Sequence, residues 1–253
     1  MNNRGRLSSD LLPIAILATF LLLLPINDSI ANETVTELVI NTTGQQPLNT
    51  PEQTGFMDLV ATEALSRIGI KLKTIQLPAE RGLKNTNAGI DDGEMSRIAG
   101  LEKHYPNLIR VPEKIMEWEF VVFSPSEINL TSGWQELKPY SVSFINGWKI
   151  LENSVPSGVS LTKVKNPKQL FNLLQKKRVD LVIYERWGGL HYLKELELDS
   201  VKMRRPPLAV REMYVYLHKK HKAIVPKLNN ALKQMKKDGS YNKLVQQILE
   251  PLN

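Results

Sequence analysis

The sequence contains no cysteine among its 253 residues. It therefore forms no disulfide bond, and it lacks the cysteine that would carry a lipid anchor after a bacterial signal peptide. A chain of this length is long enough to bury a substantial core, and 42% of its residues are hydrophobic. We expect a globular protein that is held together by its core alone.

The sequence also lacks an apolar run long enough for a comfortable membrane span. Its longest apolar run, residues 11–25, follows a short basic start that contains Arg4 and Arg6. Small residues at Ser29 and Ala31 then match the positions that a signal peptidase reads. This pattern predicts a signal peptide over residues 1–31, with cleavage after Ala31 and export to the periplasm; the alternative is an uncleaved anchor helix.

Histidine is scarce, and acidic residues do not gather in a metal-binding pattern. Asp91, Asp92 and Glu94 lack the alternating oxygen ligands and the distal glutamate of a calcium loop. The four histidines show neither a metal-site nor a catalytic-triad pattern: His104, His191, His218 and His221. We therefore expect no metal, no cofactor and no catalytic residue.

Positive charge is in excess, with 33 Lys and Arg against 26 Asp and Glu, a net charge of +7. Such a balance is compatible with nucleic acid, an anionic membrane or an anionic ligand. The lysines are spread through helix-like segments, with one cluster of basic residues at His218–Lys222, and no nucleic-acid motif accompanies them. The pattern favours a solvated basic surface and no nucleic-acid partner.

Strand and helix patterns alternate along the chain. A β-prone run over 36–41, helical spacing over 56–68 that stops at Gly69, and alternation over 70–78 predict a strand–helix–strand unit with parallel strands. A second such unit begins near Tyr140 and contains a helix with Asn166 as its cap and Pro167 at its first position.

Breaks in composition divide the chain into two parts. Joints rich in Pro and Ser lie near residues 124–126 and at Pro206–Pro207; a strand is predicted after the second joint, over 212–217, and two helices split at Asp238–Gly239 follow it. We predict an α/β fold of two lobes with a ligand cleft between them. The predicted boundaries are 1–31 for the signal peptide, 32–124 plus 209–253 for lobe 1, and 125–208 for lobe 2.

Taken together, these segments resemble the family 3 periplasmic solute-binding proteins, over nearly the whole mature chain. Gly55–Phe56 resembles the family's Gly-Phe position, and Gly89 with Asp92 resembles its Gly-x-x-Asp turn. Asp180 ends the matching turn of the second lobe, and Asp238–Gly239 resembles the closing helix pair. The resemblance implies a type II periplasmic binding fold, and the chain reads as a divergent branch because His104 stands near the place of the family's carboxylate-binding arginine.

Two arginines follow predicted strand ends, where α/β sheets place their ligands. A guanidinium offers a planar fork that fits a carboxylate, so Arg81 and Arg97 are candidate anion ligands. The alternative for Arg81 is a surface pair with Glu80 or Glu94, which would contribute little.

The second part of the chain supplies further candidates. Gly147 and Trp148 follow a strand and open a helix, where free amides can bind an anion and the indole can cover the ligand; the alternative is a glycine turn beside a core tryptophan. In the family resemblance, Glu185 stands where an acid receives the ligand ammonium; the alternative is a pair with Arg186. Trp187 and Trp118 are weaker candidates because such tryptophans are usually packing residues.

These patterns favour an exported, monomeric solute-binding protein that closes on a small polar, carboxylate-bearing solute and delivers it to the inner-membrane permease of an ABC transporter. One alternative is a ligand-binding module that reports to a membrane sensor. Another is an enzyme resembling the cyclohexadienyl dehydratases of this fold, with Glu185 or Glu94 as its acid. Gene neighbours distinguish transport from sensing, and product formation would identify an enzyme.

Overall fold

A computed structural model describes Met1 and residues 35–253, and Val35–Asn253 form one compact unit. The predicted signal peptide and its cleavage point after Ala31 lie outside the described residues. Within the described part of the chain, no helix combines the length and the apolar character needed to cross a membrane.

The first sheet is built on the predicted strand–helix–strand unit. β1 (Glu37–Thr42) pairs in parallel with β2 (Lys71–Gln76), and α1 (Phe56–Ser66) connects them, so this prediction is confirmed. β3 (Gly93–Arg97) lies on the other side of β1, and α2 (Ala79–Asn87) contacts both β1 and β3. A short β4 (Leu108–Arg110) pairs with the long last strand.

The second sheet holds the middle of the chain. β5 (Met116–Ser124) and β8 (Leu181–Glu185) are antiparallel, whereas β6 (Ser141–Ile145) pairs in parallel with β8 and with β7 (Ser160–Val164). The helices of this part are α3 (Lys149–Ser154), α4 (Pro167–Gln175) and α5 (Arg186–Glu195). As predicted, α4 is capped by the Asn166 side chain, which accepts a hydrogen bond from the Gln169 amide.

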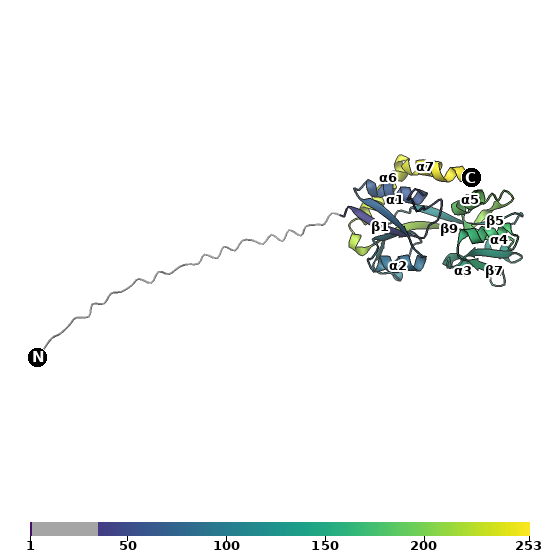
Figure 1. Cartoon of the computed structure of the whole chain (residues 1–253), viewed down its shortest axis with the longest axis horizontal. Helices are drawn as coiled ribbons and strands as arrows, with labels where there is room; N and C mark the ends of the chain where they lie inside the picture. The colour runs from purple at the N-terminus through teal and green to yellow at the C-terminus, as the bar shows by residue number, and fades with distance from the viewer. Residues whose placement is uncertain (2–34) are drawn as a thin grey trace. The chain divides into compact units, whose positions relative to one another are not determined.

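One strand runs through both sheets. β9 (Lys202–His218) pairs with β5 in the second sheet and with β3 and β4 in the first (Figure 1). The predicted strand at 212–217 was too short, because Pro206–Pro207 does not end β9. Opposite the prolines the β5–β9 register shifts between Phe120 and Val122, and such a bulge tolerates residues that cannot donate to the ladder.

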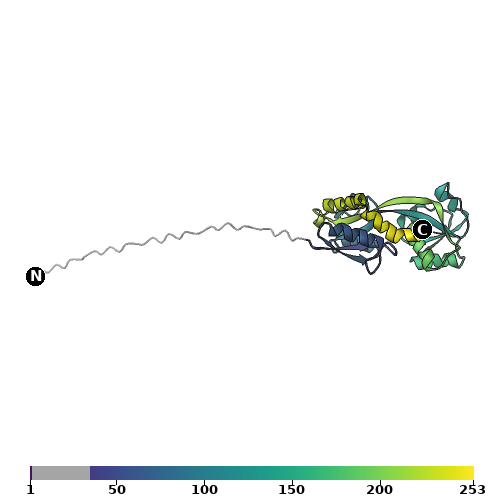
Figure 2. The ribbon, with the colours of Figure 1, turned by 90° about the horizontal axis from the view of Figure 1, so that it is seen from above.

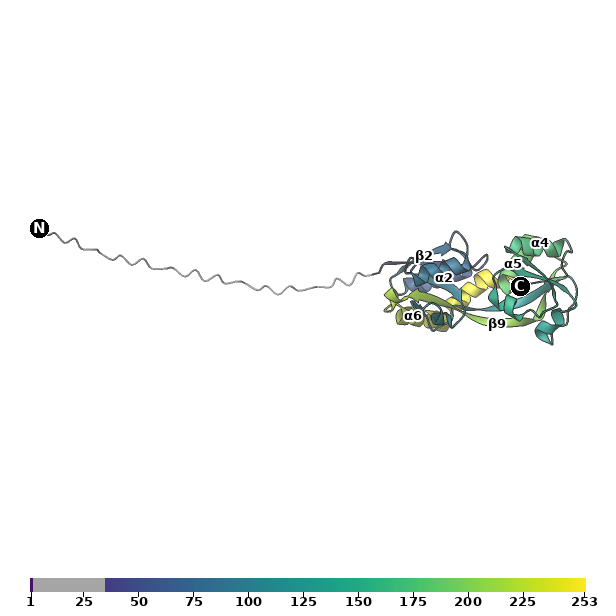
Figure 3. The same ribbon diagram turned by 90° about the horizontal axis from the view of Figure 1, so that it is seen from below.

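The chain ends on helices that return to the first sheet. α6 (Val225–Asp238) packs on α1, and α7 (Ser240–Leu244) follows after Gly239, whose φ of +84° lets the chain turn. The predicted split at Asp238–Gly239 is confirmed. From α7 the chain continues through Val245–Leu249 and Glu250–Leu252 to contact α5. Figures 2 and 3 show from above and below how this C-terminal end, in yellow, reaches the part of the molecule that holds the second sheet.

Short 3-10 segments complete the described elements: Leu101–Lys103, Gly133–Leu137 and Lys219–His221. β5 pairs along its length with strands of the second sheet, and β9 pairs with β5 as far as Met213 and with β3 from Tyr214, so the two sheets divide the chain near residues 116 and 213. The predicted lobe boundaries stay a prediction.

Candidate functional site

The loop after β1, residues 43–55, is held in shape by one buried carboxylate. Asp58 in the first turn of α1 is fully buried. Its Oδ1 accepts a hydrogen bond from Asn49 Nδ2 at 2.6 Å, and its Oδ2 accepts from the amides of Thr50 at 2.9 Å and Gly55 at 3.2 Å. The loop is therefore fixed to the helix that follows it rather than left to solvent.

This loop and the second sheet together enclose a small aromatic pocket. Loop residues 43–46 and Leu48 form one wall, and the other wall contains Trp118, Trp148, Tyr184, Glu185 and Gly188. The free volume is about 20 Å³, close to the space that one water molecule needs. The structure thus brings together three of the predicted site residues: Trp118, Trp148 and Glu185.

The aromatic wall is a packed stack of rings. Trp148 lies nearly parallel to Tyr184, with centroids 4.9 Å apart and planes at 16°, and its centroid is 5.9 Å from that of Trp118. Such contacts fix ring orientations, which is useful in a wall that must present one shape. Trp148 is only partly buried, so it is neither a wholly internal tryptophan nor a free surface one.

Glu185 ends β8 inside this pocket and caps the helix that follows. It is 2% exposed, and its carboxylate accepts hydrogen bonds from the amides of Trp187 at 3.0 Å and Gly188 at 2.8 Å. Burial raises the pKa of Glu185 to about 7, although these two amides and Arg186 favour the charged form. A buried carboxyl poised near neutrality is typical of a functional site.

Gly147 adopts a turn conformation that suits glycine, with φ of +85°. Its amide donates to Glu152 Oε1 at 3.2 Å, and Glu152 also pairs with Lys149 and Lys163. The amide that was expected to meet an anion is therefore occupied by a carboxylate of α3 itself. Its predicted ligand contact stays a prediction.

Trp187 lies just outside the pocket. The guanidinium of Arg186 stacks over its ring at 4.2 Å, and Arg186 also pairs with Glu119 at 3.0 Å. Arg186 Nη2 donates to Asn253 Oδ1 at 2.8 Å, which ties the C-terminus to the start of α5. These contacts are those of a packing residue beside the site, and the predicted ligand contact of Trp187 stays a prediction.

Arg97 is held by a buried acid at the end of β3. Its Nε donates to Glu94 Oε1 at 2.5 Å, its Nη2 bonds the same oxygen, and Nη2 also donates to the Ala79 carbonyl at the start of α2 at 2.9 Å. Residues three apart on a regular strand face opposite ways. A register shift between Glu94 and Arg97, with Ser96 at φ of +67°, brings the two side chains together.

Arg81 lies on the exposed side of α2. Within residues 35–253 it makes no ion pair, whereas its neighbour Glu80 pairs with Lys84 at 3.5 Å. The surface pair considered for Arg81 is therefore not formed, and Glu94 is paired with Arg97 instead.

Glu94 is fully buried, and its Oε2 has no hydrogen-bond partner among the described residues. Burial raises its pKa to about 7; Arg97 opposes this rise and Asp91 adds to it. Burial affects the pKa of Glu94 more than the ion pair does, because Oε2 has lost its hydrogen bonds to water and makes none within the described residues.

We expect this group to make stability depend on pH. Because the pKa of Glu94 is higher in the folded protein than the ordinary 4.5, its contribution is fully present below pH 4.5 and is lost as pH rises through 7. The loss from this group alone is about 3 kcal/mol. Urea titrations of wild type and Glu94→Gln at pH 5 and pH 8 should show a smaller pH difference in the variant; equal differences would contradict this account.

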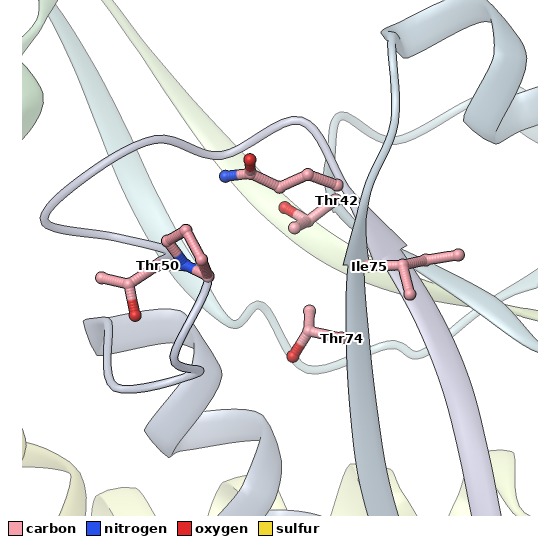
Figure 4. A pocket seen from close by; sticks show the side chains of 6 residues that line it. Thr42, Thr50, Thr74 and Ile75 are labelled. Carbon is pink, nitrogen blue, oxygen red and sulfur yellow. The ribbon is translucent and has the colours of Figure 1, made fainter.

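A second, more open hollow lies beside the same loop. It has a volume of about 180 Å³ and is lined by Thr42, Thr50, Pro51, Thr74, Ile75 and Gln76 (Figure 4). Thr74 bonds Gln53 through its amide and its hydroxyl, and Gln76 Nε2 donates to the Gly44 carbonyl. These bonds connect loop and strand, and none of the predicted site residues lines this hollow.

Sequence reasoning missed two parts of the pocket. Tyr184 lies inside a strand that reads as fully apolar, so nothing marked it as a wall residue. The loop over 43–48 has no periodicity, and only Asp58, three residues after Gly55, signalled that it is held in place. In the part of the chain that the structure describes, no three His, Cys, Asp or Glu residues are placed to hold a metal.

Comparisons with known proteins give the class of this fold. No family model matches the sequence. The chain is 28% identical over 202 residues to an uncharacterized protein of Shewanella oneidensis, with 76% of this chain and 75% of that protein covered. It is 22% identical over 198 residues to the L-cystine-binding protein TcyA of Bacillus subtilis, covering 78% and 72% of the two chains.

Solved structures of two-lobed ligand-binding and sensor proteins match most of this chain. The GluR0 ligand-binding core in complex with L-glutamate matches with a TM-score of 0.74 at 12% identity, covering 85% of this chain and 99% of that one. A histidine kinase sensor domain with similarity to periplasmic binding proteins gives 0.71 at 13%, covering 86% and 96%. The substrate-binding protein of an amino acid ABC transporter gives 0.67 at 20%, covering 85% and 99%.

The protein therefore has the two-lobed α/β fold of periplasmic solute-binding proteins, and the resemblance seen in its sequence is confirmed at the level of the fold. Two of these three structures, the GluR0 core and the transporter's substrate-binding protein, are ligand-binding proteins rather than enzymes.

Proposed function

We propose that this protein captures a small polar, carboxylate-bearing, amino-acid-like solute by closure of its two lobes, and delivers it to a membrane transporter. The observation that carries the proposal is the aromatic pocket with the buried Glu185, enclosed by a loop of the first sheet and strand ends of the second. A site made by two lobes is completed when they close on a ligand.

The carboxylate of the solute is assigned to arginine. Arg97 uses Nε and Nη2 for bonds within the protein, so Nη1 is the donor that we assign to the solute. Arg81, on the neighbouring helix, is the second candidate. Glu185 is the acceptor for a donor group of the solute, in the pocket opposite the loop.

Replacing Arg97 tests the assignment. Wild type is screened by thermal melting and calorimetry against amino acids and organic acids, and Arg97→Ala is expected to bind the best solute roughly 10- to 100-fold more weakly, since it loses a charge-assisted hydrogen bond. Arg97→Lys keeps the charge. Arg110→Ala is the matched arginine control, because Arg110 lies on β4 with its guanidinium over the ring of Tyr214 on β9. If no solute shifts the wild-type melt, the proposed capture is wrong.

Sensing is the second candidate, favoured by the match to a histidine kinase sensor domain. In both cases we propose export to the periplasm through residues 1–31. Permease and ATPase genes beside this one would favour transport, and a kinase or cyclase gene would favour sensing.

A further inference from the structure

The indole N–H of Trp118 is a donor without a partner. The residue is 9% exposed, and its Nε1 is buried with no hydrogen-bond partner among the described residues. Buried donors nearly always have a hydrogen-bond partner, because a donor without one has lost its hydrogen bonds to water and gained no other. An exception on the wall of a binding pocket points to a ligand as the missing partner.

The same pocket holds one polar side chain of the opposite kind. Glu185 is buried there, and each of its oxygens accepts a bond from an α5 amide while keeping room for another. The rest of this wall is Trp148, Tyr184 and Gly188. A group that enters the pocket therefore meets one N–H donor and one carboxylate acceptor between aromatic faces.

This pair discriminates between chemical groups. An ammonium has no acceptor, so it would leave the Trp118 N–H unpaired. A carboxylate has no donor, and above pH 7, where Glu185 is charged, it would lie beside a buried carboxylate. A primary amide or a hydroxyl carries a donor and an acceptor together and satisfies both. The free volume of about 20 Å³ admits a small terminal group rather than a ring.

We propose that Trp118 is a specificity-determining residue, whose Nε1–H donates to the oxygen of a neutral amide or hydroxyl at one end of the solute while Glu185 accepts from the same group. This proposal rests on the proposed function, and it names the class of solute: an amino-acid-like carboxylate with an amide or hydroxyl side chain.

Matched series of amino acids test the class of solute. Calorimetry with L-glutamine, L-glutamate and L-ornithine, and with L-asparagine, L-aspartate and L-2,4-diaminobutyrate, varies only the end group at nearly constant length; L-homoserine adds a hydroxyl. We expect the amide or the hydroxyl of a series to bind at least tenfold more tightly than its acid and its diamine. A tighter acid or diamine overturns the inference and leaves capture of a solute intact; no binding by any of the seven also overturns the inference, and only a failure of the whole screen of amino acids and organic acids removes capture as well.

A single ring replacement tests the residue. Trp118→Phe keeps an aromatic ring and removes the N–H, and we expect it to weaken amide binding at least fivefold and to reduce the preference over the diamine. Trp134→Phe, in the segment Gly133–Leu137, is the matched control and should leave both unchanged. Equal losses for amide and diamine in Trp118→Phe would show a packing role only and overturn the inference.

Nuclear magnetic resonance of the wild-type protein gives a readout that needs no folded variant. The indole N–H signals of the four tryptophans are recorded with and without L-glutamine or L-homoserine. The Trp118 signal should move downfield and exchange more slowly with solvent when the tighter of these two binds. A Trp118 signal that stays in place at saturation would overturn the proposal.

Discussion

Replacing Glu185 by alanine is expected to weaken solute binding roughly 100-fold, because it removes a buried hydrogen-bond acceptor to the solute. The same change leaves the amides of Trp187 and Gly188 without their acceptor, since both now bond this carboxylate. Loss of such a cap costs about 1–2 kcal/mol of stability. Calorimetry measures the first effect and urea unfolding the second.

Two companion variants separate these effects. Glu185→Gln keeps one oxygen acceptor without the charge, so it should retain part of the cap. Lys194→Ala, on the exposed side of the same helix, should change neither quantity measurably. If Glu185→Ala binds the solute as the wild type does, then Glu185 is a helix cap and nothing more.

Replacing Asp58 by alanine is expected to have the largest effect on stability, about 3 kcal/mol, because three hydrogen bonds to a fully buried carboxylate are lost together. The donors that remain, including the Thr50 and Gly55 amides, would be left unpaired around the loop after β1. Since residues 43–46 of that loop form a wall of the aromatic pocket, solute affinity should fall as well.

The matched control for Asp58 is Glu63→Ala on the same helix. Glu63 is a partly exposed partner of Arg67, so its loss should cost only a few tenths of a kcal/mol. A small loss of stability in Asp58→Ala, equal to that in Glu63→Ala, would mean that the loop is held by other contacts.

Local signals predicted most of the elements. The helical spacing that begins at Phe56, the cap at Asn166 and the break at Gly239 act within a few residues, so they can be read without the rest of the fold. Pro206–Pro207 led to a wrong start for the last strand. β9 accommodates these prolines at a bulge where it faces β5, and that bulge depends on pairing between segments that are distant in the sequence.

The site was predicted in part for the same reason. Trp148 was selected because it follows a strand, Glu185 through the family resemblance, and Trp118 as a weaker candidate at the start of a strand; the fold brings the three into one pocket. The pairing of Arg97 with Glu94 was not foreseen, because it depends on a register shift that turns two residues of opposite faces toward each other. Nothing in the sequence distinguishes Tyr184 from the other residues of an apolar strand.

The central claim is that a solute is held by closure of the two lobes, and a distance between them tests it most directly. The chain has no cysteine, so the double variant Lys84→Cys, Asn153→Cys can be labelled at two exposed positions only, on α2 and on α3. Pulsed electron paramagnetic resonance then reads the distance with and without the tightest solute of the screen. The account predicts a shorter and narrower distance distribution with solute bound; an unchanged distribution at saturation would contradict it.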